Sequence, residues 1–142
     1  MSNPEKLKWS NILSIGNQAI DNDHAELLSI FNQLVDLTNK EGSRSEFAEI
    51  LSRMTDYARQ HFKKEEAYME KFAYPNLSEH KKSHQTYIQT VANYNLSFLR
   101  NQKPDPIALL MFIESWWTNH ILHADSMFER YKNGINAEVN YK

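Results

Sequence analysis

Five histidines and two carboxylates recur in this sequence at positions where the surrounding pattern calls for apolar side chains. The seven residues are His24, His61, Glu65, His80, His84, His120 and Asp125. The pairs His61/Glu65 and His80/His84 are each spaced four residues apart, so each pair lies on one face of a helix. Burying so many imidazoles and acids costs on the order of several kcal/mol each unless they find partners. A pair of metal ions bridged by the carboxylates would offset that cost, because one ion cannot use seven ligands.

Other interpretations exist for single members of this set. A lone histidine on an apolar helix face, such as His24, is more often a hydrogen-bonded core residue than a ligand. His120 and Asp125 are five residues apart and therefore about 140° apart on an ideal helix. A local π-bulge, or an aspartate that reaches in from the side, is needed to bring them together. His123, one turn from His120, competes as a ligand; its other interpretation is a partly exposed or supporting residue.

The ligand types limit the metal. The chain has no cysteine, which excludes disulfides, thiolate zinc sites, iron–sulfur clusters and cysteine nucleophiles. Imidazoles with bridging carboxylates favour two irons over copper. Ferritin-like di-iron proteins require Glu-x-x-His on two helices, but no Glu here is followed three residues later by His. A site with five neutral nitrogens should hold dioxygen rather than split it.

Stretches with a 3.6-residue period predict four helices that would position these residues. An irregular arm of residues 1–20 precedes the first helix, which Asp21 or Asn22 can cap. Gly42 and Ser43 then break the chain before the second helix.

Proline marks the later boundaries. Tyr74-Pro75 ends the second helix, because the residue before proline avoids helical geometry, and the third helix starts at about Asn76. Asp105 as N-cap and Pro106 at the first helical position favour the start of the fourth. Long helices joined by short loops run antiparallel to their neighbours. The sequence therefore predicts an all-α, up-down-up-down four-helix bundle.

Composition narrows the class of protein further. We expect one domain in 142 residues, with a bundle of about 21–131 and a loosely held, weakly periodic tail of 132–142. The 16 basic and 18 acidic residues are interspersed, so nucleic acid is not an expected partner. A membrane is not expected either, because the chain has no apolar run of about 18 residues. Residues 1–9 lack the apolar segment of a secretory signal, and we expect a cytoplasmic location.

Four segments together resemble the bacterial hemerythrins. They are residues 20–24 (IDNDH), 61–69 (HFKKEEAYM), 74–84 (YPNLSEHKKSH) and 116–125 (WWTNHILHAD). The similarity extends over about residues 9–131 and includes all seven ligand positions of that family in order.

This resemblance implies a specific ligand set for two iron ions (Fe2+/Fe3+) with an oxo or hydroxo bridge. Three histidines would hold one iron: His80, His84 and His120. Two would hold the second iron and leave it an open position: His24 and His61. Two carboxylates would bridge the pair: Glu65 and Asp125. The resemblance also favours His120 over His123, and it implies that dioxygen binds as a hydroperoxide at the open position.

The resemblance also points to an oxygen pocket. Phe62, Trp116 and Ile121 match family positions that line it, with Leu27 or Leu28 beside them, although the same side chains could simply fill a core. Trp117 departs from the family, in which leucine is usual three residues before the ligand histidine. We consider three roles for Trp117: it narrows the pocket, it donates its indole N–H to bound oxygen, or it packs outward between helices.

The expected function is reversible dioxygen binding for delivery, storage or scavenging. The alternatives are a redox enzyme that turns over peroxide, nitric oxide or nitrite at the same site, and an oxygen or redox sensor module. The sequence shows no acid or base evidently placed at the open position, apart from a possible donor at Trp117, so binding is favoured over catalysis. Dioxygen is the expected partner, and the sequence does not identify a reductase or an oxygen-consuming enzyme.

Overall fold

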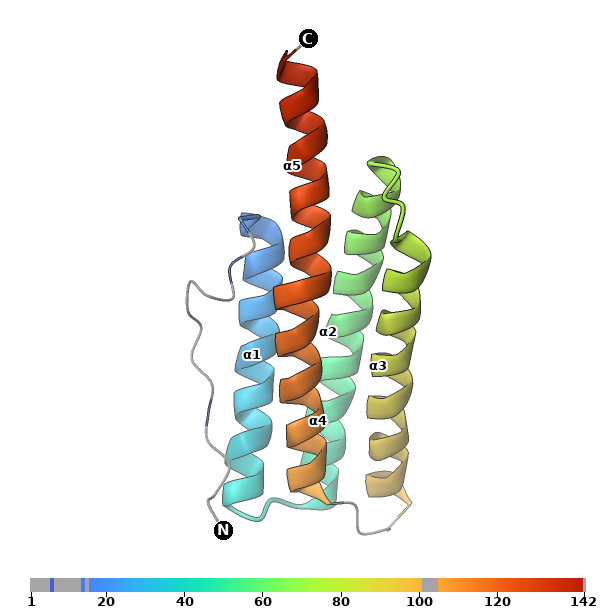
Figure 1. The fold of residues 1–142 in the computed structure, drawn as a ribbon. Coiled ribbons are helices and arrows are strands. Elements are labelled where there is room, and N and C mark those ends of the chain that lie inside the picture. The colour runs from blue at the N-terminus through green and yellow to red at the C-terminus, as the bar shows by residue number, and fades with distance from the viewer. Residues whose placement is uncertain (1–5, 7–13, 15, 101–104, 142) are drawn as a thin grey trace.

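The fold is the antiparallel four-helix bundle that the sequence predicts. The computed structural model describes the backbone of residues 6, 14, 16–100 and 105–141, and the side chains of these except 99 and 135–141. Its helices are α1 (Gln18–Asn39), α2 (Arg44–Lys71), α3 (Leu77–Leu99), α4 (Pro106–Asn119) and α5 (Ser126–Tyr141). A π-helix, His120–Asp125, joins α4 to α5, and the three form one continuous rod beside α1 (Figure 1).

Side chains fix where the helices begin. The predicted cap of α4 is confirmed, because the side chain of Asp105 accepts hydrogen bonds from the first turn of α4. At the start of α2, Ser43 forms a reciprocal capping box with Glu46. The predicted cap of α1 is wrong. The side chain of Asn17 accepts from the backbone N–H of Ile20 at 3.2 Å, so α1 begins earlier than expected. Most of the predicted arm lies outside the described residues.

The buried polar residues form a layer between two apolar clusters. The larger cluster includes Leu51, Met54 and Ala58 of α2, whereas the smaller one is built from Met69, Tyr74 and Phe128. His61 and Glu65 lie between these clusters along α2. Along the α4–α5 rod, polar residues also lie between residues of the larger cluster and residues of the smaller one. All four helices of the bundle therefore place polar side chains at the same level.

The last helix is longer than expected. The sequence predicts a loosely held tail of residues 132–142, but the backbone stays helical to Tyr141 and projects past the ends of the other helices (Figure 1). Its base is held by the buried carboxylate of Glu129, which accepts from the Asn17 amide at 3.1 Å and pairs with Lys132 at 2.7 Å. None of the described helices is both long and apolar enough to cross a lipid bilayer.

Candidate metal centre

The seven polar residues singled out in the sequence meet inside the bundle. All are between 1% and 5% exposed. They come from α1 (His24), α2 (His61 and Glu65), α3 (His80 and His84) and the π-helix (His120 and Asp125). Their potential ligand atoms form two groups, each with atoms within 4.8 Å of one another: Glu65, His80, His84 and His120 in one, and His24, His61, Glu65 and Asp125 in the other. The histidines divide three and two between the groups, and Glu65 belongs to both, whereas Asp125 belongs to the second only.

Glu65 belongs to both groups because its two oxygens face in different directions. Its Oε1 lies 2.6 Å from Nε2 of His80 and 3.2 Å from Nε2 of His84. Its Oε2 lies 3.2 Å from Nε2 of His61. One carboxylate thus presents one oxygen to each group, as a bridging ligand must.

Asp125 divides its oxygens in the same way. Its Oδ1 lies 3.1 Å from Nε2 of both His80 and His120. Its Oδ2 lies 3.1 Å from Nε2 of His24. The two carboxylates therefore span the same two groups of histidines.

Several of these buried atoms lack a hydrogen-bond partner among the described residues. They are both ring nitrogens of His24, Nε2 of His61, Oε2 of Glu65 and both carboxylate oxygens of Asp125. In addition, Nε2 of His84 and Nε2 of His120 face each other at 3.0 Å. Leaving a buried polar group unpaired costs about 1–3 kcal/mol. Ring nitrogens and carboxylate oxygens that converge in this way can bind a cation in each group once the rings lose their protons, so the set of ligand atoms suits two metal ions.

The charges of the centre are consistent with metal binding. Burial alone would raise the pKa of Glu65, but the surrounding histidines hold it well below its usual range. Burial and the charge of Glu65 raise the pKa of Asp125, yet His120 and His24 lower it to about 2 overall. Both carboxylates are therefore ionised at neutral pH. Burial lowers the pKa of His61, but Asp23, followed by Glu65 and Asp125, raises it to about 9 overall. Asp125 and Glu65 likewise raise the pKa of His80 to about 9 against the effect of burial.

The π-helix resolves the five-residue spacing of His120 and Asp125. In a π-helix hydrogen bonds run from residue i to i+5, so residues five apart lie above one another. His120 and Asp125 are its first and last residues, and both side chains are buried. The predicted local distortion is confirmed. His123 is exposed and belongs to neither group formed by the described residues.

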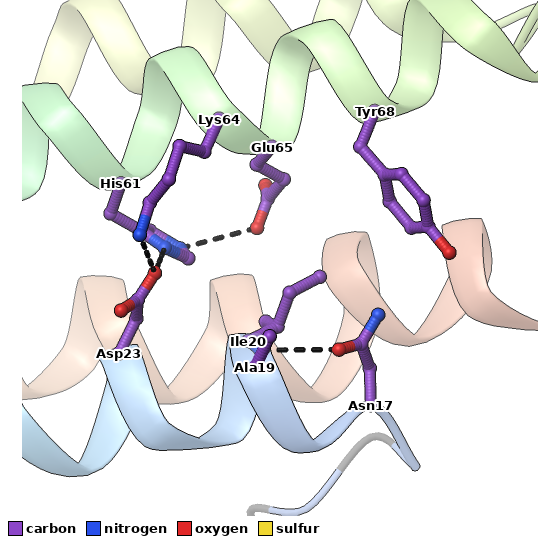
Figure 2. A pocket seen from close by; sticks show the side chains of 8 residues that line it. All are labelled: Asn17, Ala19, Ile20, Asp23, His61, Lys64, Glu65 and Tyr68. Carbon is purple, nitrogen blue, oxygen red and sulfur yellow. Dashed lines mark hydrogen bonds and ion pairs between the residues drawn. The ribbon is translucent and has the colours of Figure 1, made fainter.

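Sequence reasoning missed Asp23 as a partner of the centre. Its Oδ2 accepts a hydrogen bond from Nδ1 of His61 at 2.9 Å and lies 3.2 Å from Nζ of Lys64, as Figure 2 shows. Tyr57 donates its hydroxyl to Oδ1 at 3.1 Å. The His61 hydrogen bond is the largest cause that lowers the pKa of Asp23, to about 2. Asp23 thereby keeps the proton of His61 on Nδ1 and leaves Nε2 free for a metal.

Glu66 plays the same part on the other side and was also missed. Its Oε2 lies 2.8 Å from Nδ1 of His84, which turns Nε2 of that ring toward Glu65. The available signal was the position of each acid next to a candidate ligand in the sequence.

Aromatic side chains cover the centre on one side. Phe62 stacks on His84 with ring centroids 3.8 Å apart, and Trp116 stacks on His120 at 4.3 Å. Trp117 packs inward rather than outward. The centroid of its indole lies 5.8 Å from the ring centroid of His24 and 6.2 Å from that of His61. Ile121 is 5% exposed. Phe62 and Trp116 thus lie against histidines of the group with three, and Trp117 lies beside the group with two histidines.

The indole of Trp117 packs against the ring of Tyr87, with ring centroids 5.2 Å apart. Burial raises the pKa of the Tyr87 hydroxyl, and the Trp117 N–H acts in the opposite direction. The two groups do not align as a hydrogen bond, and neither has another partner among the described residues. Tyr87 is fully buried and was not singled out in the sequence.

A cavity of about 320 Å³ reaches the centre from the surface between α1 and α2. His61 and Glu65 line its inner part, and Asp23 and Lys64 lie on its wall (Figure 2). The side chain of Lys64 is 69% exposed.

Comparison with known proteins identifies the family. The profile of the hemerythrin HHE cation binding domain matches residues 16–131. A bacteriohemerythrin of Stenotrophomonas maltophilia (strain R551-3) is 31% identical over 94% of this chain and 84% of its own length. A hemerythrin-like protein of Naegleria gruberi is 25% identical over 89% of this chain and 93% of its own. The crystal structure of a wild-type hemerythrin superposes with a TM-score of 0.80 at 26% identity, covering 87% of this chain and 95% of that one. With a family profile that spans most of its length, this chain belongs to the hemerythrin family.

Proposed function

We propose that this protein binds dioxygen reversibly at a pair of iron ions, for delivery, storage or scavenging of oxygen. The observation that carries the proposal is the division of the oxygens of Glu65 and Asp125 between two groups of histidines. Two carboxylates in this arrangement support two bridged ions rather than one. An oxo or hydroxo bridge would complete the centre.

The two groups supply unequal numbers of ligands. The group of His80, His84 and His120 offers three nitrogens, whereas that of His24 and His61 offers two. Since the carboxylates are shared, the ion beside His24 and His61 would have one protein ligand fewer and room for dioxygen. When bound, the iron pair would supply the electrons that dioxygen takes up on binding.

The surroundings favour binding over turnover. Phe62, Trp117 and Ile121 are buried apolar or aromatic side chains near the centre, and such walls keep water away from a bound ligand. Tyr87 is a titratable group near this wall that is outside the proposed ligand set. Because burial raises its pKa, its hydroxyl holds its proton at neutral pH and is a poor general acid.

A redox enzyme is the second candidate function. The specific observation in its favour is the pair of buried donors without aligned partners, Tyr87 Oη and Trp117 Nε1, which could bind a polar substrate atom.

An oxygen cycle separates the two functions. The protein is loaded with ferrous iron under anaerobic conditions, exposed to dioxygen and returned to anaerobic buffer, and the visible absorption spectrum is recorded at each stage. Reversible binding predicts a new absorption band that appears with oxygen and disappears on its removal over several cycles. One-way conversion to a ferric spectrum with product formed at each addition of peroxide or nitrite would support the enzyme instead. Failure to bind iron would contradict both.

A further inference from the structure

A second cavity reaches the other group of the centre. It has a volume of about 440 Å³ and lies on the opposite wall of the bundle, along α4 and the π-helix. Exposed Ser115, Asn119 and His123 line its outer part, and the buried ring of His120 lines its inner part. An imidazole with no role in the proposed centre therefore shares a cavity with one that has such a role.

Metal ions must have a way to the centre, because every proposed ligand is at most 5% exposed. One cavity reaches His61 and Glu65, and the other reaches His120. An ion entering either cavity would meet different charges on the way.

The cavity between α1 and α2 presents a positive charge near its outer end, whereas the carboxylate of Glu65 lies in its inner part. The exposed ammonium group of Lys64 lies on its wall and repels divalent cations. The carboxylate of Asp23, which could attract them, already lies 3.2 Å from Nζ of Lys64 and accepts hydrogen bonds from His61 and Tyr57.

The cavity around His123 lacks this obstacle. Of the described residues that line it, none is a lysine or an arginine. Imidazole is a good ligand for divalent first-row metals, and amide and hydroxyl oxygens suit an ion that keeps part of its water shell. His123, Asn119 and Ser115 provide these atoms at the surface.

We propose that His123 forms a transit site at which ferrous iron binds before it passes inward to His120 and the group of three histidines. This inference rests on the proposed metal centre. A single imidazole with neutral oxygens binds an ion weakly, whereas the inner group offers three imidazoles and ionised carboxylates. The ion therefore moves inward, because the inner group offers more ligand atoms and more negative charge than His123 does.

Rapid mixing of metal-free protein with Co²⁺ tests this inference without any oxygen chemistry, since the visible spectrum of bound cobalt reports its coordination. In the unsubstituted protein the uptake rate should saturate as cobalt concentration rises, because ions first occupy His123. The variant His123→Ala should lose this fast saturable phase and still reach the same final cobalt content. His123 is exposed, and a circular dichroism spectrum will show that the variant is folded.

Lys64→Ala tests whether metal ions enter through the cavity between α1 and α2. Its uptake should match that of the unsubstituted protein if ions pass His123. Unchanged kinetics in His123→Ala would overturn the proposal, and so would faster uptake in Lys64→Ala, because the ions would then enter by the cavity between α1 and α2. Absence of cobalt binding by the unsubstituted protein would instead contradict the metal centre itself.

Discussion

Asp23 on α1 accepts a hydrogen bond from Nδ1 of His61 on α2 at 2.9 Å. The acid therefore supports a histidine on another helix rather than its sequence neighbour His24. Since the pKa of Asp23 is lowered to about 2, chiefly by this hydrogen bond, the carboxylate remains ionised at all pH values where the protein would work. It fixes the tautomer and the orientation of the His61 ring.

Asp23→Asn should weaken binding of one metal ion and leave the other in place. The amide cannot accept as strongly, so Nε2 of His61 is a poorer ligand, and loss of such supporting contacts lowers metal affinity by about 10–100-fold. Competition with a chelator of known affinity measures both ions. Asp36→Asn is the matched control, because Asp36 lies on the same helix with a side chain that is 55% exposed. Equal affinities in both variants would refute the role of Asp23.

Glu65 and His84 should differ in how many ions they hold. Glu65 belongs to both groups and His84 to one. Glu65→Ala should therefore impair binding of both ions, whereas His84→Ala should impair one. Elemental analysis of the reconstituted, desalted proteins gives the metal content per chain. Retention of two ions in Glu65→Ala would show that this residue is not a bridge.

Metal binding should release protons at pH 7. In the metal-free protein, burial lowers the pKa of His61 and of His80, but nearby carboxylates raise each to about 9 overall. Both rings are therefore protonated at pH 7 and must lose a proton to bind a metal, so metal affinity should rise with pH up to about 9. Calorimetric titration in two buffers with different ionisation enthalpies counts the protons. A binding heat that is independent of the buffer would contradict this prediction.

The same pKa shifts affect the stability of the metal-free protein. A raised pKa stabilises the fold fully below the ordinary value of 6.5, and this contribution is lost as pH rises through about 9. Thermal unfolding at pH 6.5 and pH 9.5 should show the loss in metal-free protein, whereas metal-loaded protein, whose rings are unprotonated, should not show it.

Trp117→Leu should accelerate both oxygen release and autoxidation. The indole lies about 6 Å from His24 and His61, and a smaller side chain would open the space beside the group with two histidines to water. Tyr87→Phe is the control, because it removes only the hydroxyl of a ring that packs against Trp117. If Trp117 acts through the volume of its side chain, Tyr87→Phe should release oxygen and autoxidise at rates close to those of the unsubstituted protein. Unchanged rates in Trp117→Leu would remove the hypothesis.

The sequence predicts the four helices and the convergence of seven polar residues, because helical periodicity determines which side chains face inward. The sequence also indicates a departure from α-helical geometry, since His120 and Asp125 cannot share a face of an ideal α-helix. The choice between a π-helix and a sideways aspartate depends on packing between helices. Periodicity along one helix does not contain that information.

Contacts between distant residues explain what the sequence did not reveal. Asp23 meets a histidine 38 residues away rather than its neighbour. Asn17, Asp21 and Asn22 could each cap α1, and Asn17, the observed cap, also contacts Glu129, 112 residues away. The inward position of Trp117 likewise depends on Tyr87 and Phe62 from two other helices.

The most direct test of the account is anomalous X-ray diffraction from iron-loaded crystals, recorded at the iron absorption edge. Two anomalous peaks per chain are expected, about 3.5–4 Å apart. One should contact His80, His84 and His120, the other His24 and His61, and both Glu65 and Asp125. A single peak, or two peaks with neither carboxylate in contact with both, would contradict it.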